Sequence, residues 1–206
     1  MPDQASTTRW PAYYKWGEGR PPRPLLLDVL ARWEAEAADG APRQAIDLGC
    51  GDGTETLALL QDGWHVLAVD REPEAMAYVR AKVAPEHEAR LETRIAAFED
   101  VHLPPADLVY AGLSLPFCAP ASFDAVWARI VAALRPGGRF AGQFFGVRDS
   151  WADDPAMNFH TAEQVQQFLQ GFAIEYFREV DEDGIAFSGP KHWHVFEVIA
   201  RKSVWY

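Results

Sequence analysis

The stretch AIDLGCGDGT, residues 45–54, decides the fold of this chain. The apolar run 44–48 has the length of a buried strand, and residues 55–61 have helical character. Between them stand three glycines at alternate positions: Gly49, Gly51 and Gly53. Glycines let the chain turn sharply and bring backbone N–H groups close to a ligand, and a side chain at Gly51 would collide with that ligand. The stretch therefore predicts a strand, a tight turn and a helix. Such a turn occurs in ligand-binding loops, dinucleotide-binding domains among them, and also in purely structural turns, so the rest of the sequence must decide.

Strands and helices alternate along the rest of the chain. Further strands are predicted at residues 65–69, 90–97, 106–111, 139–145, 173–180 and 193–200. Helices are predicted at residues 24–38, 73–83, 122–134 and 161–170, the last with Thr161 as N-cap and Gln164 at the capping-box position. Turns are expected at residues 39–42, 135–138 and 181–190. This alternation predicts an α/β fold, in which a mostly parallel sheet is covered on both faces and a final hairpin adds an antiparallel strand.

The first residues differ from the alternating part. Residues 1–22 contain several prolines and glycines, which break helices, so we expect an irregular arm there. The arm is rich in aromatic residues, which a disordered tail seldom is. We therefore divide the chain into an N-terminal aromatic arm, residues 1–23, and a single domain, residues 24–206.

The overall charge and the cysteines exclude several classes of partner. A formal net charge of -11 would repel phosphate backbones, so nucleic acid is not expected as a substrate. Cys50 and Cys118 lack metal-ligand spacing and are too few for a disulfide framework, so we expect a reducing compartment and no metal site. No run approaches the roughly 20 apolar residues that span a bilayer, and the N-terminus lacks a signal peptide. A soluble, cytoplasmic protein is expected.

The charges of the glycine loop distinguish between two kinds of ligand. A dinucleotide-binding fingerprint that starts at Gly49 requires Gly or Ala where this chain has Thr54, and it does not require an acid at Asp47. Asp47 and Asp52 together would repel a pyrophosphate, whereas they suit a ligand with a cationic ammonium or sulfonium group. The loop therefore favours S-adenosylmethionine over NAD, and it disfavours a nicotinamide-dependent oxidoreductase.

Asp70 ends the second predicted strand, 17 residues after Gly53. At this place a carboxylate can accept hydrogen bonds from both hydroxyls of a ribose. The alternative is that Asp70 caps the helix that opens at Pro73.

Three motifs occur in an order that resembles the class I S-adenosylmethionine-dependent methyltransferases. They are the run 45–54, then Val69-Asp70, then the turn LRPGG at residues 134–138. The resemblance covers roughly residues 24–145, and within the superfamily the chain looks most like the small tellurite-resistance-type bacterial branch. It implies a Rossmann-like three-layer sandwich with a seven-stranded, mostly parallel sheet of order 3-2-1-4-5-7-6, whose last strand is antiparallel.

The resemblance also implies roles for individual residues toward S-adenosyl-L-methionine. It assigns Asp47 and Gly49 to the amino-acid end of the cofactor, Asp70 to the ribose and Arg71 to the edge of the adenine. A third motif, which flanks the adenine in the family, corresponds to Phe98 and Glu99, although Asp100 is an alternative to Glu99. Ser114 lies in the segment after the fourth strand, where the family places methyl transfer; it contacts the cofactor or the substrate, or it only forms a turn.

The arm and three later aromatic residues complete the expected site. In this superfamily such arms commonly fold over the cofactor as a lid, and the polar residues available here are Tyr13, Tyr14, Lys15 and Arg20. Arg20 would then pair with the methionyl carboxylate, unless it is simply exposed beside the prolines. The walls of the substrate pocket are expected from Trp151, Phe159 and Trp193.

Methyl transfer is a direct displacement, which positioning alone can accelerate. If the acceptor must lose a proton, the candidate bases are His160, His192 and His194, of which the last two would share one face of a strand. We expect a methyltransferase that acts on a small-molecule acceptor, releases S-adenosyl-L-homocysteine and is a monomer or homodimer. The alternative is a non-catalytic S-adenosylmethionine-binding or regulatory protein with the same fold.

Overall fold

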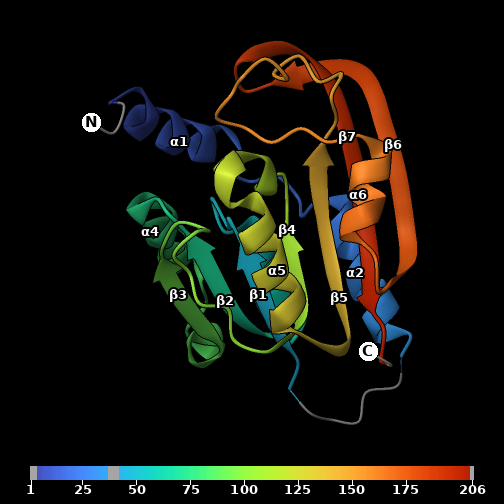
Figure 1. Ribbon diagram of the computed structural model, residues 1–206. Helices are drawn as coiled ribbons and strands as arrows, with labels where there is room; N and C mark the ends of the chain where they lie inside the picture. The colour runs from blue at the N-terminus through green and yellow to red at the C-terminus, as the bar shows by residue number, and fades with distance from the viewer. Residues whose placement is uncertain (1–3, 37–41, 205–206) are drawn as a thin grey trace.

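A seven-stranded sheet forms the middle layer of the computed structural model, which describes residues 4–36 and 42–204. The strands lie in the order β3 (Leu91–Ile95), β2 (His65–Asp70), β1 (Gln44–Leu48), β4 (Ala106–Ala111), β5 (Leu134–Phe145), β7 (Gly189–Lys202) and β6 (Phe172–Ala186). Strand β7 runs antiparallel to both of its neighbours, and the other pairings are parallel (Figure 1). The predicted strand order and the antiparallel last strand are confirmed.

Helices cover both faces of the sheet, because side chains alternate along each strand. Ile46 and Leu48 of β1 pack against one layer, formed by α5 (Phe123–Ala133) and α6 (Ala162–Phe168). Ala45, between β2 and β4 on the opposite face, packs in the cluster that contains α2 and α3. The helices on that side are α2 (Pro24–Glu34), α3 (Thr54–Gln61) and α4 (Pro73–Lys82). The fold is thus the Rossmann-like three-layer sandwich expected from the sequence.

Several predicted boundaries agree with the structure. Strands β1 and β4 and the capping box of α6 have the predicted residues, with Thr161 Oγ1 accepting a hydrogen bond from the Gln164 N–H. Residues 135–138, predicted as a turn, bulge from the β4–β5 ladder, because Ala106 pairs with Leu134 and Leu108 with Arg139. The predicted turn at residues 39–42 lies largely outside the described residues. Within the described ranges, no helix is long and apolar enough to cross a bilayer.

The N-terminal arm is not irregular as predicted. Residues Gln4–Trp16 form helix α1, which accommodates Pro11 in its interior, and among the described residues of the arm those from Gly17 to Arg23 lack regular structure. Proline removes a helical hydrogen bond, yet here tertiary packing compensates for that loss. The ring of Trp10 lies 4.9 Å from the ring of Phe117, and Tyr14 is almost completely buried.

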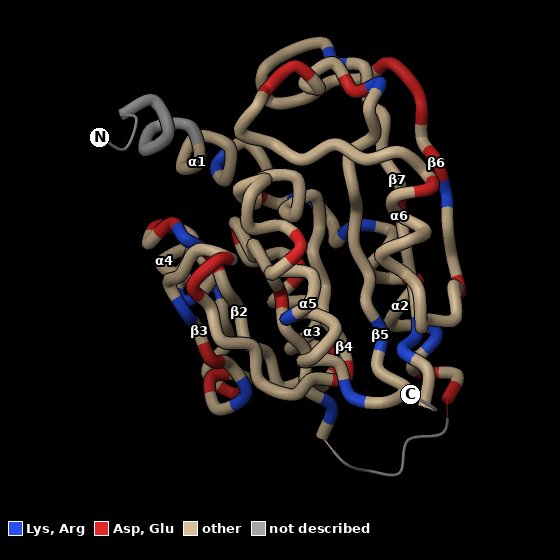
Figure 2. The backbone as a smooth tube through the Cα atoms, in the orientation of Figure 1, with Lys and Arg blue, Asp and Glu red and all other residues tan. Residues whose placement is uncertain are grey.

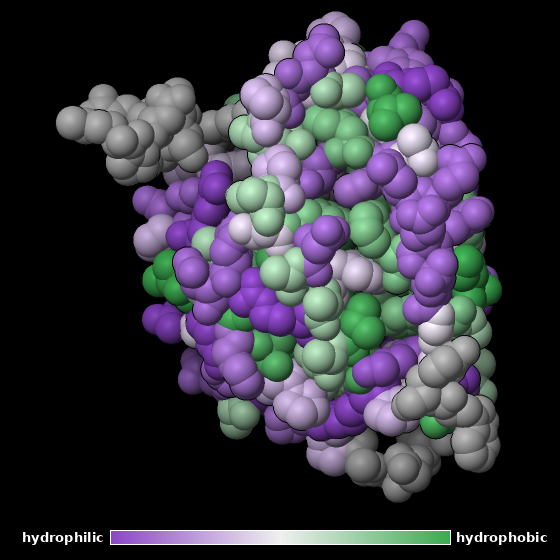
Figure 3. All heavy atoms as spheres, viewed as in Figure 1, coloured by the Kyte–Doolittle hydropathy of each residue, from purple (hydrophilic) through white to green (hydrophobic). Residues whose placement is uncertain are grey.

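The predicted turn at residues 181–190 is also wrong. Strands β6 and β7 continue beyond the rest of the sheet as a two-stranded ribbon, which turns only at Phe187 and Ser188. Its acidic residues and Gly184 resemble a turn in the sequence, but Asp181 and Asp183 both reach His192 across the ribbon. Figure 2 shows acidic residues at the upper end of β6, and Figure 3 shows a mostly hydrophilic surface on that side.

Candidate functional site

A cavity of about 490 Å³ opens at the carboxyl ends of the parallel strands, where ligands bind in sheets of this kind. The loop after β1, the end of β2 and the segments after β3 and β4 form its floor. Helix α1 and the tip of the β6–β7 hairpin also line it. Figure 1 shows both beyond the carboxyl ends of the parallel strands. Its volume lies within the range of roughly 300–1,000 Å³ that is typical of small-molecule sites.

The glycine loop approaches its neighbours too closely for side chains. Gly49 has a φ of +81°, and a Cβ atom there would lie 2.4 Å from Cβ of Ser114. A Cβ atom on Gly51 would lie 3.3 Å from the ring of Tyr14. Both glycines line the cavity, so the predicted close approach of backbone to ligand is available at these positions.

Asp70 lies at the bottom of the cavity and is nearly buried. One carboxylate oxygen accepts a hydrogen bond of 2.9 Å from the Gly51 N–H. The other accepts one from the Glu72 N–H at 3.0 Å and one from the Tyr14 hydroxyl at 3.4 Å. Burial raises the pKa of Asp70. Asp70 does not cap helix α4, whose N-cap residue is Glu72.

Asp47 lies beneath the loop and does not line the cavity. It accepts a hydrogen bond of 2.6 Å from the Thr56 hydroxyl. Burial, together with the nearby charge of Glu55, raises the pKa of Asp47 to about 7. Asp47 therefore lies behind the loop in this structure, and its contact with the amino-acid end of a cofactor stays a prediction.

The residues expected beside an adenine lie together. Arg71, Phe98 and Glu99 all line the cavity, whereas Asp100 is exposed outside it. Glu99 accepts a hydrogen bond of 2.9 Å from the Ala119 N–H, which fixes its carboxylate at the cavity wall. Between the two acids that the sequence left open, the structure places Glu99 at the cavity.

The segment after β4 holds a strained residue that sequence reasoning missed. Leu113 has a φ of +56°, which is rare for a residue with a branched side chain, and its N–H donates a hydrogen bond of 3.0 Å to Oε1 of Gln143. The neighbouring Ser114 lines the cavity, and its hydroxyl donates to the Leu48 carbonyl. This serine therefore ties the loop after β4 to the end of β1.

Arg20 and Tyr14 also line the cavity. The Arg20 guanidinium donates two hydrogen bonds, of 2.6 and 2.5 Å, to the buried carboxylate of Glu55, and it lies 3.3 Å from Asp52. Burial of Glu55 disfavours its charged form, but the hydrogen bonds and charge of Arg20 hold its pKa below the usual value. Arg20 thus forms an ion pair inside the protein at the cavity wall, and its pairing with a methionyl carboxylate stays a prediction.

Aromatic residues form the opposite end of the cavity. Trp151 and Trp193, two of the predicted walls, line it, whereas Phe159 packs behind on Phe145, with 6.2 Å between ring centroids. Sequence reasoning missed Phe117 and Phe145, whose proximity depends on tertiary structure.

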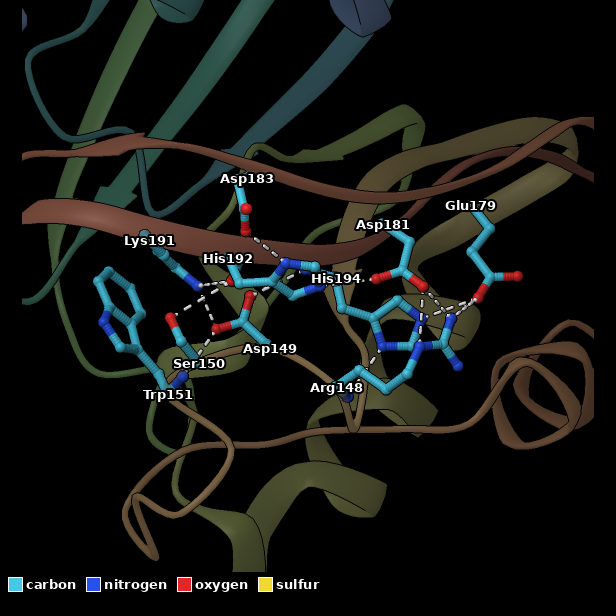
Figure 4. Close-up of polar contacts among 10 residues, drawn as sticks. All are labelled: Arg148, Asp149, Ser150, Trp151, Glu179, Asp181, Asp183, Lys191, His192 and His194. Atoms are coloured by element: carbon cyan, nitrogen blue, oxygen red, sulfur yellow. Dashed lines mark hydrogen bonds and ion pairs between the residues drawn. The ribbon is translucent and has the colours of Figure 1, made fainter.

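None of the three predicted catalytic histidines lines the cavity. His160 sits between rings of helices α5 and α6, where burial lowers its pKa to about 4. His192 and His194 do share one face of β7, but Trp193 between them points to the cavity, so both face the acids of β6 (Figure 4). This placement gives no support to a role of these histidines as general bases.

Within the described part of the chain, one group of side chains is close enough to hold a metal ion: Glu179, Asp181 and His194, on the outer side of the hairpin. Arg148 already bonds both carboxylates, at 2.6 Å to Glu179 and 2.8 Å to Asp181 (Figure 4). The guanidinium supplies the positive charge that an ion would bring, so we assign no metal here.

The residues around the cavity fit S-adenosylmethionine. Asp70 offers a carboxylate to ribose hydroxyls, and the apolar ring of Phe98 beside Glu99 suits a planar base. Glu55 and Asp52 beside the glycine loop are paired with Arg20, which leaves Asp47, hydrogen-bonded to Thr56, as the acid whose carboxylate can match a cationic sulfonium or ammonium.

Comparisons with known proteins agree with this geometry. The family model of a methyltransferase domain matches residues 45–138. Trans-aconitate 2-methyltransferase from Acidovorax sp. (strain JS42) is 30% identical over 135 residues, which are 65% of this chain and 48% of that protein. Carboxy-S-adenosyl-L-methionine synthase from Dichelobacter nodosus is 30% identical over 163 residues, which are 77% of this chain and 65% of that protein. The chain thus spans about half to two thirds of the length of these curated relatives.

Two solved structures share the fold. TehB from Haemophilus influenzae has a TM-score of 0.72 at 14% identity, covering 86% of this chain and 61% of that one. The 1,6-didemethyltoxoflavin-N1-methyltransferase of Burkholderia thailandensis, solved with bound S-adenosylhomocysteine, has a TM-score of 0.67 at 23% identity, covering 97% and 88%. At such identities the likeness concerns the fold, so the tellurite-resistance-type branch stays a prediction. The motifs, the sheet order and the domain matched at residues 45–138 together support a class I S-adenosylmethionine-dependent methyltransferase, with S-adenosylmethionine as its cofactor.

Proposed function

We propose that this protein methylates a small-molecule acceptor by direct displacement. One observation carries the proposal: a single cavity joins the Asp70 and glycine-loop end, which fits the cofactor, to an aromatic end that leaves room for a second ligand. Two ligands held in one cavity with their reacting atoms aligned meet the main requirement of a displacement reaction.

The bound cofactor supplies a methyl group activated by a sulfonium. The chain's own residues bind and orient. Asp70 and the backbone around Gly51 hold the nucleoside end, and the carboxylate of Asp47 behind the loop stabilises the positive charge of the cofactor. Ser114 and Leu113 fix the shape of the segment between the two ends of the cavity, and the aromatic rings line the end that receives the acceptor.

Acid–base chemistry has a small part in this proposal. Among the described residues that line the cavity there is no histidine or lysine, and the lining acids belong to the cofactor end. We therefore assign no general base, and positioning supplies the acceleration.

The arm acts as a lid in this proposal, and residues 24–206 form the catalytic domain. Trp10 and Tyr14 of helix α1 line the cavity, and the ring of Tyr13 lies 6.1 Å from that of Phe187 at the hairpin tip. The protein works on small molecules in the cytoplasm as a monomer or homodimer, and its net charge of -11 disfavours nucleic acid.

Calorimetric titration with S-adenosylhomocysteine tests the cofactor site. Asp70→Ala removes a carboxylate that would accept charge-assisted hydrogen bonds from the ribose, so the affinity should fall about 10- to 100-fold. Asp100→Ala, which removes an exposed acid just outside the cavity, should bind like the wild type. Equal affinity of the Asp70 variant and the wild type would contradict the assignment, and so would a larger thermal shift with NAD than with S-adenosylhomocysteine.

The alternative, a non-catalytic binding protein, predicts the same titration result. A screen of small acceptors with methyl-labelled S-adenosylmethionine separates the two. Transfer of label to an acceptor supports the enzyme, whereas persistent silence with intact binding supports the non-catalytic protein.

A further inference from the structure

The end of the cavity that lies away from the glycine loop is built from aromatic rings. We call Phe117, Phe145, Trp151 and Trp193 the aromatic compartment. Their ring centroids follow one another at 6.0 to 6.5 Å, from Phe117 to Phe145 and Trp151, and from these two to Trp193. The rings come from η2 (Leu115–Phe117), β5, the loop after β5 and β7, so separate parts of the chain converge on one apolar space.

This end of the cavity is free of charged lining residues. Among the described residues, the lining positions contributed by residues 112–119, by β5, by the loop after it and by the hairpin include none that is charged. The charged lining residues come instead from the segment before α2, the glycine loop, the end of β2 and the segment after β3. An ionic acceptor placed against the rings would lose its hydration without gaining a partner there.

A lysine does lie nearby, but it is behind the rings. The Lys191 side chain is fully buried and outside the cavity lining, with Nζ at 4.2 Å from the ring centroid of Trp151 and 4.3 Å from that of Trp193. It is paired with Asp149, and the same carboxylate oxygen of Asp149 accepts a hydrogen bond from the backbone N–H of Trp151 (Figure 4). Its charge is therefore already neutralised, and the pair holds the two indole rings in place.

We propose that the acceptor is an uncharged, planar aromatic or heteroaromatic molecule, selected by stacking on Trp151 and Trp193. This inference rests on the proposed function, since it specifies the substrate of that same site. Planar rings gain from stacking on other rings, beyond the burial of apolar area. Among the described residues that line the compartment there is no cation to pair with a polycarboxylate or a chalcogen oxyanion, so the lining disfavours such acceptors.

The transfer step balances without a further reactant. A hydroxyl oxygen or ring nitrogen of the acceptor forms the new bond to the methyl carbon with its own electron pair. The carbon–sulfur bond breaks with its pair remaining on sulfur, and the proton of the acceptor passes to water. The products are the methylated aromatic compound and the neutral thioether.

Ligand-observed NMR titrations of the protein loaded with S-adenosylhomocysteine test the proposal. The probes are 2-naphthol, its saturated counterpart decahydro-2-naphthol, trans-aconitate and tellurite. We expect 2-naphthol to bind about tenfold more tightly than the saturated alcohol, and the two anions to show no binding. Equal binding of the two alcohols, or tighter binding of either anion, overturns the proposal.

Two variants locate the binding. Trp151→Leu and Trp193→Leu should each weaken 2-naphthol about tenfold and leave the affinity for S-adenosylhomocysteine unchanged. Trp33→Leu is the control, because this tryptophan packs on Trp64 outside the cavity. Unchanged naphthol binding in both cavity variants overturns the proposal. If the wild-type protein does not bind S-adenosylhomocysteine at all, the proposed function is overturned instead. The titration with 2-naphthol is then repeated in the absence of S-adenosylhomocysteine, which distinguishes failure of the cofactor site from failure of the acceptor site.

Discussion

Substitution of Gly49 by alanine tests the architecture of the cofactor loop. The added Cβ would lie 2.4 Å from Cβ of Ser114, whereas carbon atoms in contact are about 3.5–4.0 Å apart, so the serine must move by more than about 1 Å. That movement breaks the hydrogen bond from its hydroxyl to Leu48, which costs about 0.5–1.5 kcal/mol, and crowding adds about 1–3 kcal/mol. The left-handed backbone of residue 49 costs an alanine a further ~1–2 kcal/mol.

Gly171→Ala isolates the backbone contribution. Its φ of +85° is close to that of Gly49, but no atom lies within 4 Å of the position of its Cβ. In urea denaturation, Gly49→Ala should therefore lose about 1.5–4.5 kcal/mol more of the free energy of unfolding than Gly171→Ala. It should also bind S-adenosylhomocysteine more weakly, which Gly171→Ala should not. Equal losses of stability in the two variants refute the close packing of Gly49 against Ser114.

Protonation of Asp47 should weaken binding of S-adenosylhomocysteine. Burial raises the pKa of Asp47 to about 7, and the ammonium group of the ligand favours the charged carboxylate. Calorimetry should therefore show about tenfold lower affinity at pH 6 than at pH 8. In Asp47→Asn the affinity should not change between these two pH values. Burial lowers the pKa of His160 to about 4, from about 6.5 in the unfolded chain, so protonation favours unfolding and stability should fall as the pH drops through this window. Urea denaturation at pH 5 and pH 8 should show a loss of up to about 2 kcal/mol that His160→Gln lacks. Arg20→Ala deprives the buried Glu55 of its guanidinium partner and should cost about 1–3 kcal/mol, while Lys15→Ala, an exposed residue of the same arm, should cost almost nothing in the same assay.

The sheet was predictable because its signals are local. Strand β1 ends at a glycine and β4 lies between turn-forming segments, so their apolar runs have clear limits. Helix α1 and the hairpin were missed for opposite reasons. The helix is held by the packing of Tyr14 against the glycine loop, which the sequence does not display, and the polar hairpin owes its length to cross-strand pairs such as Asp181 with His192.

From the sequence, only those residues of the candidate site that belong to a recognisable motif could be predicted. The glycine loop and Asp70 follow from spacing along the chain, whereas Phe117 and Phe145 reach the cavity through tertiary contacts. The sequence predicted that His192 and His194 share one face of a strand, but not that this face points away from the cavity. Because side chains alternate along β7, Trp193 faces the cavity and the two histidines beside it face away. Lys191 lies on the same face of the strand as Trp193, behind the aromatic rings.

A crystal structure of the protein with S-adenosylhomocysteine tests the central claim most directly. We predict the ribose hydroxyls within hydrogen-bonding distance of the Asp70 carboxylate, the adenine beside Phe98 and the sulfur directed toward the aromatic compartment. A ligand bound elsewhere on the molecule, or a ribose that does not contact Asp70, would contradict the account.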